Sequence, residues 1–320
     1  MNRLLSLGID TSNYKTSVAI VDAEGNILFN HQKLLEVKSG ERGLRQSEAL
    51  FQHVQRLPGV LEKVLADKSI RRSIAAVAVS SRPRPVEGSY MPVFTAGIGY
   101  ARAVAAALGV PFYEFSHQEG HIEAVKHYSD MYDAGRFVCF HFSGGTTEAI
   151  YVDNDRNIFE IVGGSKDLAY GQVLDRLGVA LGYEFPCGAA LDEIAVSLHT
   201  QGAKPDKSLL TKIKVSNAYV NLSGIETQCQ RLVGNVSKEE LINAVFFRLS
   251  ESVAEMTRQL SEKYNLRAFL YAGGVSCSSY MRKYLESSFD NSIEPVFGSP
   301  EMSSDNAVGT ALLGGKKIWL

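Results

Sequence analysis

The sequence repeats one arrangement of strands and turns, and this repeat restricts the possible folds more than any other feature. Between residues 4 and 27 it predicts a buried strand, a polar turn at 10–13, a second strand, a hairpin turn and the start of a third strand. The same order returns between residues 137 and 158. Three pairs of polar turn residues are separated by the same 131 residues: Asp22 and Asp153, Asn26 and Asn157, and Ser12 and Ser143. Two hairpins can look alike by chance, but a constant offset favours an internal duplication.

Helical and strand patterns follow each copy of the repeat. Apolar spacing predicts helices at 45–66, 98–108, 167–181 and 238–264, and buried strands at 75–80 and 268–272. This order predicts two α/β domains side by side, with ligands at the strand ends between them. We place the first domain at 1–115 together with 303–320, and the second at 116–302.

The composition fits a globular chain without a strong surface charge. Of its 320 residues, 45% are hydrophobic, and the formal net charge is -2, so any contact with nucleic acid must use local patches or a partner. No apolar run reaches the ~20 residues of a membrane helix. The cysteines are far apart and match no zinc-finger spacing, which favours a reducing cytoplasm; they are Cys139, Cys187, Cys229 and Cys277.

Two histidines one helical turn apart suggest a metal site. Ser116 and Glu119 have the spacing of a capping box, so a helix should begin there and carry His117 and His121 on one face. Such a pair can bind one metal ion, although two surface histidines would give the same pattern. The position after the first histidine is Gln118, whereas zinc peptidases have a catalytic glutamate there, so a peptidase is disfavoured.

Three glycine-rich or hydroxyl-rich turns follow predicted strands, at 10–12, 143–147 and 273–276. Glycines let backbone N–H groups approach an anion, and hydroxyls add donors. Tight turns also use these residues for structure alone. Together, in a duplicated fold, the three turns suggest a nucleotide held between two lobes, and the chain has no Walker A or G-x-G-x-x-G motif.

The chain resembles the TsaD/Kae/Qri family of tRNA threonylcarbamoyl-transferases, once described as glycoproteases. The resemblance runs through nearly the whole chain, and its most specific parts are the H-x-E-G-H motif at 117–121 and the S-D-N-A motif at 304–307. Further matches lie at 7–12, 143–145, 175–192, 222–224 and 272–275. The resemblance implies a duplicated actin-like ATPase (ribonuclease-H-like) α/β fold, with a ligand cleft between two lobes.

The resemblance also implies the site residues. His117, His121 and Asp305 match the positions that bind iron or zinc in the family; Asp305 could instead cap the final helix. The substrate and nucleotide positions of the family, together with the first polar turn, give the following candidates: Asp10, Ser143, Gly144, Gly145, Thr146, Thr147, Asp175, Gly188, Asp192, Gly273, Gly274 and Ser278. Asp175 and Asp192 could also be solvated carboxylates on a helix face.

Several positions depart from the pattern of the family. Thr146 stands where histidine is usual, Ser278 where asparagine is usual, and Cys187 where glycine is usual. A longer segment at 81–88, which includes Arg82 to Pro85, replaces a Gly-Pro-Gly turn. Because the metal positions are kept while the substrate and nucleotide loops differ, we expect a divergent paralogue.

The resemblance predicts a metal-dependent acyltransferase in tRNA processing. It would transfer a threonylcarbamoyl group from threonylcarbamoyl-adenylate, an AMP-containing donor, to an adenosine of tRNA, with accessory subunits meeting a helical surface at 45–66 or 98–108. Arg82 and Arg84 form a local basic spot for phosphate or an exposed stiff loop. No residue is identified as nucleophile or general base. Two alternatives remain: carbamoyl transfer to a small molecule, and a nucleotide-binding regulatory paralogue without catalysis.

Overall fold

A computed structural model describes residues 4–12, 15–37, 44–154, 156, 158–290 and 292–319. The chain divides into two compact units. Unit 1 contains Met1–Tyr128 and Ser304–Leu320, and unit 2 contains Ser129–Ser303. Two predicted turn residues, Asn13 and Asn157, lie outside the described residues.

Unit 1 is built on a five-stranded mixed sheet. Its strands are β1 (Leu5–Asp10), β2 (Lys15–Asp22), β3 (Ile27–Leu34), β4 (Ile74–Arg82) and β5 (Phe112–Ser116). The strand order is β3-β2-β1-β4-β5, antiparallel from β3 to β1 and parallel from β1 to β5. Every residue of β1 is buried, because helices cover both faces of the sheet.

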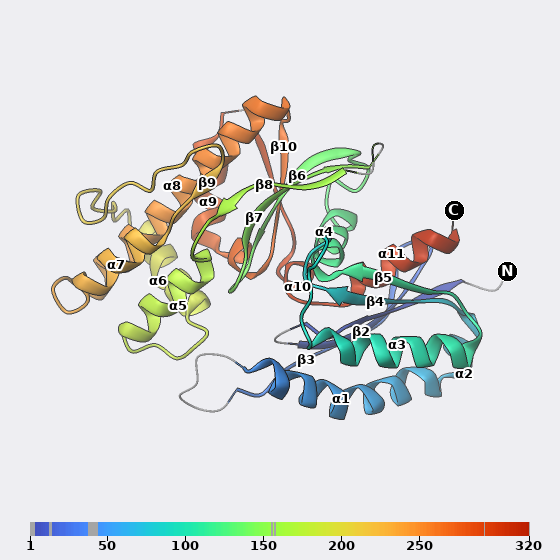
Figure 1. Ribbon diagram of the computed structural model, residues 1–320. Helices are drawn as coiled ribbons and strands as arrows, with labels where there is room; N and C mark the ends of the chain where they lie inside the picture. Colours follow the sequence, from blue (N-terminus) through green and yellow to red (C-terminus); the bar gives the residue numbers. More distant parts are fainter. Residues whose placement is uncertain are drawn as a thin grey trace. The chain divides into compact units, whose positions relative to one another are not determined.

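The helices of unit 1 form two layers. One layer contains α1 (Gln46–Ala66), the short α2 (Lys68–Ser73) and α3 (Phe94–Leu108), and its apolar side chains form one core with those of β1 and β4 (Figure 1). The other contains α4 (His117–His127) and α11 (Val308–Trp319), and α11 packs on β1, β2 and β4. The prediction for α1 is correct to within one residue, whereas α3 begins four residues before the predicted start at 98.

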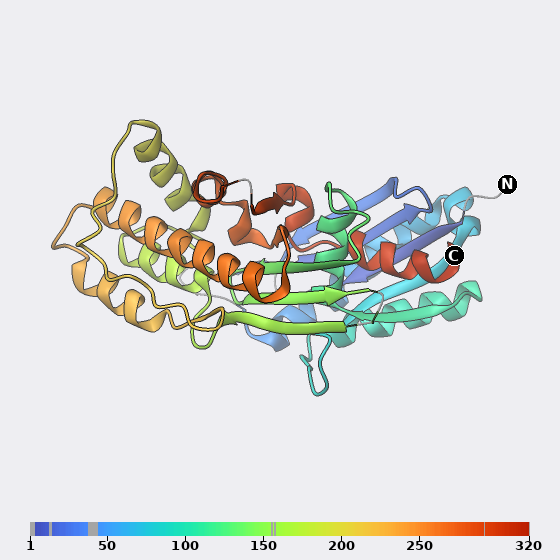
Figure 2. The same ribbon diagram turned by 90° about the horizontal axis from the view of Figure 1, so that it is seen from above.

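Unit 2 repeats this plan with a six-stranded sheet. Its strands are β6 (Arg136–Phe142), β7 (Thr147–Asp153), β8 (Ile158–Ser165), β9 (Tyr219–Val220), β10 (Ala268–Ala272) and β11 (Glu294–Phe297), in the order β11-β10-β6-β7-β8-β9. Its helices are α5 (Tyr170–Ala180), α6 (Gly188–Thr200), α7 (Ser223–Leu232), α8 (Lys238–Tyr264), α9 (Ser279–Ser288) and α10 (Pro300–Ser303), with a 3-10 turn at Gly274–Cys277. The long helix α8 lies along the sheet in both views (Figures 1 and 2), and its buried face supplies much of the core.

The two sheets confirm the duplication. The antiparallel strands β1, β2 and β3 correspond to β6, β7 and β8, and the parallel neighbours β4 and β5 correspond to β10 and β11. The hairpin turns of the two copies are also held by an aspartate in the same way. The Asp22 carboxylate accepts hydrogen bonds from the backbone of Glu24 and Asn26, and the Asp153 carboxylate accepts one from the backbone of Arg156. The constant spacing between the polar turn residues of the two copies therefore reflects two equivalent hairpins.

The division into units differs from the predicted domain boundary at 115 and 116. The structure groups α4 with unit 1, which ends its first segment at Tyr128 and resumes at Ser304. Close packing of α4 on α11 explains the difference. A Cβ atom added to Gly309 would lie 1.8 Å from the Gly120 carbonyl oxygen, so these backbones touch where no side chain would fit.

The start of α5 also differs from its prediction. The pattern suggested a helix from residue 167, but α5 begins at Tyr170. The Asp167 carboxylate accepts hydrogen bonds from the Leu222 and Ser223 amides at 2.7 and 3.0 Å, and thus caps α7 instead. Among the helices that the structure describes, none is long and apolar enough to cross a membrane.

Candidate functional site

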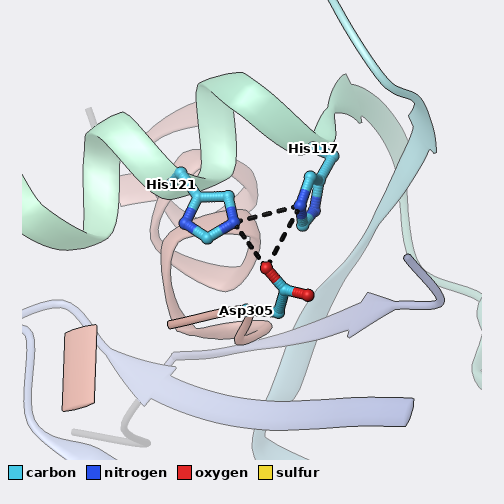
Figure 3. Close-up of side chains that lie close together, drawn as sticks. All are labelled: His117, His121 and Asp305. Carbon is cyan, nitrogen blue, oxygen red and sulfur yellow. Dashed lines mark hydrogen bonds and ion pairs between the residues drawn. The ribbon is translucent and has the colours of Figure 1, made fainter. Parts of the chain in front are cut away.

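The start of α4 presents two histidines on one face, as the sequence predicts (Figure 3). The Ser116 hydroxyl accepts a hydrogen bond from the Glu119 amide at 3.1 Å, and the Glu119 carboxylate accepts one from the Ser116 amide at 2.6 Å. This capping box fixes the first turn. It also engages the Glu119 carboxylate at the terminus of the helix.

Asp305 joins the two histidines from the segment that precedes α11. His121 Nε2 lies 3.0 Å from His117 Nε2 and 3.0 Å from Asp305 Oδ1, and His117 Nε2 lies 3.6 Å from the same oxygen (Figure 3). His121 is buried, and His117 and Asp305 are half-buried. One donor atom from each residue thus faces a common point, and all three residues belong to unit 1.

These three donors fit a transition metal. Two ligand atoms at ~2.0–2.1 Å from a tetrahedral ion lie roughly 3.3 Å apart. The observed separations of 3.0, 3.0 and 3.6 Å lie around that value. Two imidazoles and one carboxylate leave coordination positions open, as in catalytic sites, and this donor set suits iron or zinc.

Asp10 orients the first histidine. Its carboxylate accepts a hydrogen bond from His117 Nδ1 at 2.7 Å, which keeps a proton on Nδ1 and directs Nε2, the atom that would bind a metal, toward His121 and Asp305. Asp10 is the last residue of β1 and is buried. The sequence identified Asp10 as a loop residue for an anion, whereas its contact with His117 gives it a positioning role.

Ser12 and His53 form a further layer of hydrogen bonds around the site. The sequence placed Ser12 only in a turn suited to an anion, and it did not single out His53. Ser12 donates a hydrogen bond from its hydroxyl to Asp305 Oδ2 at 3.3 Å, and its amide donates to Asp10 at 2.9 Å. His53 Nε2 lies 2.9 Å from the Ser12 carbonyl, which can only accept, so this nitrogen carries the proton. For His53, the signal in the sequence was a polar residue on the apolar face of the helix predicted at 45–66.

Charges in this group stabilise one another. Burial favours the neutral form of Asp10, but the neighbouring His117 outweighs it and lowers the pKa of Asp10. Burial likewise favours neutral Asp305, yet His117 and His121 hold its pKa well below the usual range. Burial alone would lower the pKa of His117; Asp10 and Asp305 instead raise it to about 10. Without a metal, His117 is therefore protonated on both nitrogens at neutral pH, and a metal ion must displace the proton on Nε2.

The last helix is capped by Asn306 and not by Asp305, which was the alternative role considered for Asp305. The Asn306 side-chain oxygen accepts a hydrogen bond from the Val308 amide at 2.9 Å, at the first residue of α11. Asp305 instead contacts His121 and Ser12.

The candidate substrate loop of unit 2 is a tight turn between β6 and β7. The Ser143 hydroxyl accepts a hydrogen bond from the Thr146 amide at 3.0 Å, and Thr147 accepts one from the Tyr170 amide at 2.9 Å. Gly144 and Gly145 are exposed. The turn thus exposes its backbone at Gly144 and Gly145, while Thr147 connects it to α5.

The loop after β10 lies against the end of β6. Gly273 has a φ of 90°, and a Cβ atom there would lie 2.3 Å from the Phe142 carbonyl oxygen. Only glycine tolerates both conditions. The structure therefore brings Gly273 and Gly274 beside the loop that begins at Ser143, at the carboxyl ends of two parallel strands, where α/β sheets bind ligands.

The remaining candidates make structural hydrogen bonds within unit 2, so neither aspartate is a merely solvated carboxylate. Asp175 accepts a hydrogen bond from the Cys187 amide at 2.8 Å, directly before α6 begins at Gly188. Asp192 accepts hydrogen bonds from the Ser279 and Tyr280 amides at 2.8 and 3.1 Å. Burial raises the pKa of Asp175, and hydrogen bonds from the Cys187 and Gly188 amides oppose this increase without cancelling it.

Ser278 is the N-cap of α9. Its hydroxyl accepts a hydrogen bond from the Met281 amide at 3.1 Å and donates one to the Asp192 carboxylate. One lone pair and the proton of this hydroxyl are thus used at the helix terminus and by Asp192. The predicted basic spot is also partly neutralised, because an Arg82 nitrogen lies 3.8 Å from Glu119.

The sequence matches one family over most of its length. The family model described as TsaD, tRNA N6-adenosine threonylcarbamoyltransferase, matches residues 27–312. A tRNA N6-adenosine threonylcarbamoyltransferase of Prochlorococcus marinus (strain MIT 9312) is 30% identical, with 96% of this chain and 89% of the relative covered. The protein of the same name from Fusobacterium nucleatum is 26% identical, covering 95% and 88%.

Solved structures with low sequence identity share the fold. HypF in its phosphate- and nucleotide-bound form has a TM-score of 0.63 at 10% identity; 99% of this chain is covered, and it spans about half, 47%, of that chain. Component A of the (R)-2-hydroxyglutaryl-CoA dehydratase of Acidaminococcus fermentans has a TM-score of 0.57 at 16% identity and covers 98% of both chains. A ROK family glucokinase from Streptomyces griseus has a TM-score of 0.53 at 13% identity, over 98% of this chain and 99% of its own. These likenesses confirm the predicted actin-like ATPase fold.

Proposed function

Because the chain belongs to the TsaD family of tRNA N6-adenosine threonylcarbamoyltransferases, we propose that it transfers a threonylcarbamoyl group from threonylcarbamoyl-adenylate to an adenosine of tRNA in the cytoplasm. His117, His121 and Asp305 would hold one iron or zinc ion. The observation that carries the proposal is the convergence of these donors, with Asp10 fixing the tautomer of His117.

The reaction requires no covalent enzyme intermediate. The exocyclic amine of adenosine forms a C–N bond to the carbonyl carbon of the donor, the bond from that carbon to the phosphate oxygen breaks, AMP leaves and the amine loses a proton. A bound metal would supply Lewis acidity for a donor oxygen. No general base is assigned among the described residues.

The turn from Ser143 to Thr147 is our candidate for the acyl part of the donor. Its exposed glycines let N–H groups approach oxygen atoms, and it is already held by internal hydrogen bonds. Thr146 replaces the usual histidine of this motif with a shorter side chain that carries only a hydroxyl. We therefore expect a different contact to the acyl group from that of most family members.

The nucleotide part of the donor would contact the loops of Gly273, Gly274 and Gly188. Asp175 hydrogen bonds to the residue before Gly188, and Ser278, which follows the glycine loop, hydrogen bonds to Asp192. Ser278 and Asp192 hydrogen bond to each other and to α9. This arrangement leaves less hydrogen-bonding capacity for adenosine than the amide of the usual asparagine, which offers both a carbonyl and an NH₂. We infer weak nucleotide binding, which Ser278→Asn should strengthen in calorimetry with AMP.

An accessory subunit would meet the layer of α1 and α3. A hollow of about 380 Å³ along α3 is lined by Thr95, Ile98, Gly99, Arg102, Ala103 and Ala106. On the neighbouring helix α1, Phe51 and Val54 are 57% and 42% exposed. A large apolar side chain left at the surface beside a concave face is typical of a protein interface.

The test supplies the purified chain, accessory subunits of a related system, threonylcarbamoyl-adenylate and unmodified tRNA, and measures the modified nucleoside by mass spectrometry. We expect the nucleoside to form with the wild-type chain and not with Asp305→Asn. If none forms while an authentic family member succeeds in parallel, transfer to tRNA is excluded. Release of AMP with a small-molecule acceptor would then identify a different transferase, and no AMP release would identify a regulatory protein.

A further inference from the structure

A second hollow, in unit 2, has a lining suited to an anion. Its volume is about 250 Å³, and its lining consists of Lys166, Lys214, Ser216, Tyr219 and Asn221. Two ammonium groups, a hydroxyl and a side-chain amide can all donate hydrogen bonds there. No carboxylate is present among these lining residues, and both lysines are exposed. One lining residue, Tyr219, belongs to β9, the strand at the edge of the sheet (Figure 1).

A strained turn builds this surface. Ser216 and Tyr219 exchange two backbone hydrogen bonds, at 2.9 and 3.0 Å, around Asn217 and Ala218, which have φ values of 51° and 60°. An alanine with positive φ is strained, because its Cβ is crowded by the backbone. Buried contacts hold it: the Ala218 amide donates to Gln259 Oε1 at 2.8 Å, and its carbonyl accepts from the Gly164 amide at 2.9 Å. Such over-determined strain is often found at binding sites.

One of the two lysines has a contact that restrains it beside the hollow. The Lys166 ammonium lies 5.2 Å from the centre of the Tyr219 ring, a cation–π contact that limits its motion. The nearest acidic side chain along the chain, Asp167, is directed at the Leu222 and Ser223 amides. The positive charge of Lys166 is therefore not neutralised by its neighbour in sequence.

The surrounding sequence extends the positive charge beyond the hollow. Residues 204–214 contain four lysines and one aspartate, in a chain whose overall charge is -2. That aspartate, Asp206, accepts hydrogen bonds from Ser208. A single phosphate would need only the hollow, whereas a polymer with regularly spaced phosphates would also use this segment.

We propose that this hollow, the Lys166–Lys214 site, binds a backbone phosphate of RNA. At about 250 Å³ the hollow is smaller than the ~300–1,000 Å³ of most small-molecule sites, so it fits one phosphate with its sugar rather than a whole nucleotide. Donors without sequence-reading geometry position the RNA backbone and do not select bases. The inference rests on the proposed function, because it gives the proposed tRNA substrate a local basic contact on a chain whose net charge is -2.

The experiment measures binding of unmodified tRNA to the full chain by fluorescence anisotropy over a series of salt concentrations. The variant Lys166→Glu/Lys214→Glu should bind about tenfold more weakly, since charge-assisted hydrogen bonds to phosphate are lost. The slope of log K against log salt should fall by about 1. The pair Lys166→Arg/Lys214→Arg should retain binding, and circular dichroism should show both variants folded.

The matched control is Lys263→Glu/Lys283→Glu, which changes the charge of unit 2 equally. Lys263 also lies over a tyrosine ring, 5.0 Å from the centre of Tyr264, but outside the hollow. Equal weakening in both pairs, no weakening in either, or no measurable binding by the wild type at 50 mM salt would overturn the inference.

Calorimetry with inorganic phosphate separates free phosphate from RNA as the ligand. We expect the wild-type chain not to bind phosphate at millimolar concentration. The RNA assignment would be overturned if the wild type bound phosphate, Lys166→Glu/Lys214→Glu did not, and both bound tRNA equally. Failure of the proposed function is distinguishable. It would appear as absent nucleoside formation by the wild type, whereas failure of this inference would leave transfer intact and tRNA binding unaffected by the variants.

Discussion

Asp10 determines which nitrogen of His117 faces the other metal ligands. Its buried carboxylate fixes the proton on Nδ1, and Ser12 connects it to Asp305. Spacing and a capping box were enough to predict His117 and His121 from the sequence, and the resemblance supplied Asp305. The roles of Ser12 and His53 could not be predicted, because residues 41 positions apart meet only in the folded chain.

Replacing Asp10 with asparagine should weaken metal binding about 10–100-fold, as is typical when the partner of a ligating histidine is changed. The amide keeps the shape of the carboxylate but loses its charge. Competition with a chromogenic chelator measures the affinity. Asp22→Asn is the matched control, because Asp22 pairs with Leu5 at the far end of the ladder of β1 and β2. Similar losses in the two variants would argue against a positioning role for Asp10.

The metal-free chain should lose stability as pH rises. The pKa of His117 is raised from 6.5 to about 10, so its stabilising contribution is complete below pH 6.5 and disappears as pH rises through about 10. Urea unfolding in the presence of a chelator should show a free energy of unfolding that falls across this interval. His117→Gln should have a weaker pH dependence there. Parallel curves for the two proteins would contradict the assigned protonation.

At the scale of elements, the contact of α4 with α11 holds the metal ligands together. Gly120 lies between His117 and His121, and it touches Gly309 one turn after Asp305. The boundaries of α1, α8 and β10 were predicted from local patterns within a residue. The start of α5 was not, because Asp167 is used by α7, a tertiary contact that no local pattern contains.

Gly309→Ala should therefore destabilise the chain by several kcal/mol, roughly 2–5, because the added Cβ would lie 1.8 Å from the Gly120 oxygen and the helices would have to separate. Metal affinity should fall with stability. Gly99→Ala on α3 is the control: nothing lies within 4 Å of the added atom, and alanine favours the helix by ~0.5–1 kcal/mol. Chemical denaturation measures both variants, and equal stability would disprove the close approach.

At the scale of the whole molecule, the chain has a duplicated fold whose two units carry different candidate sites. Unit 1 carries the candidate metal ligands and the exposed apolar surface of α1 and α3, whereas unit 2 carries the glycine loops and the Lys166–Lys214 site. The duplication was predictable because turn residues recur at one offset. The Lys166–Lys214 site was not predictable, since Lys166 is more than forty positions away from the other lining residues and meets them only at β9.

The most direct test of the central claim is a metal titration of threonylcarbamoyl transfer. Chain stripped by a chelator under anaerobic conditions is given increasing iron or zinc, and the modified nucleoside in tRNA is measured by mass spectrometry. We predict that transfer is absent without metal and is restored with about one equivalent per chain, and that Asp305→Asn is not restored at the same metal concentration. Full transfer by the stripped chain, or equal restoration of Asp305→Asn, would contradict the metal centre proposed for His117, His121 and Asp305.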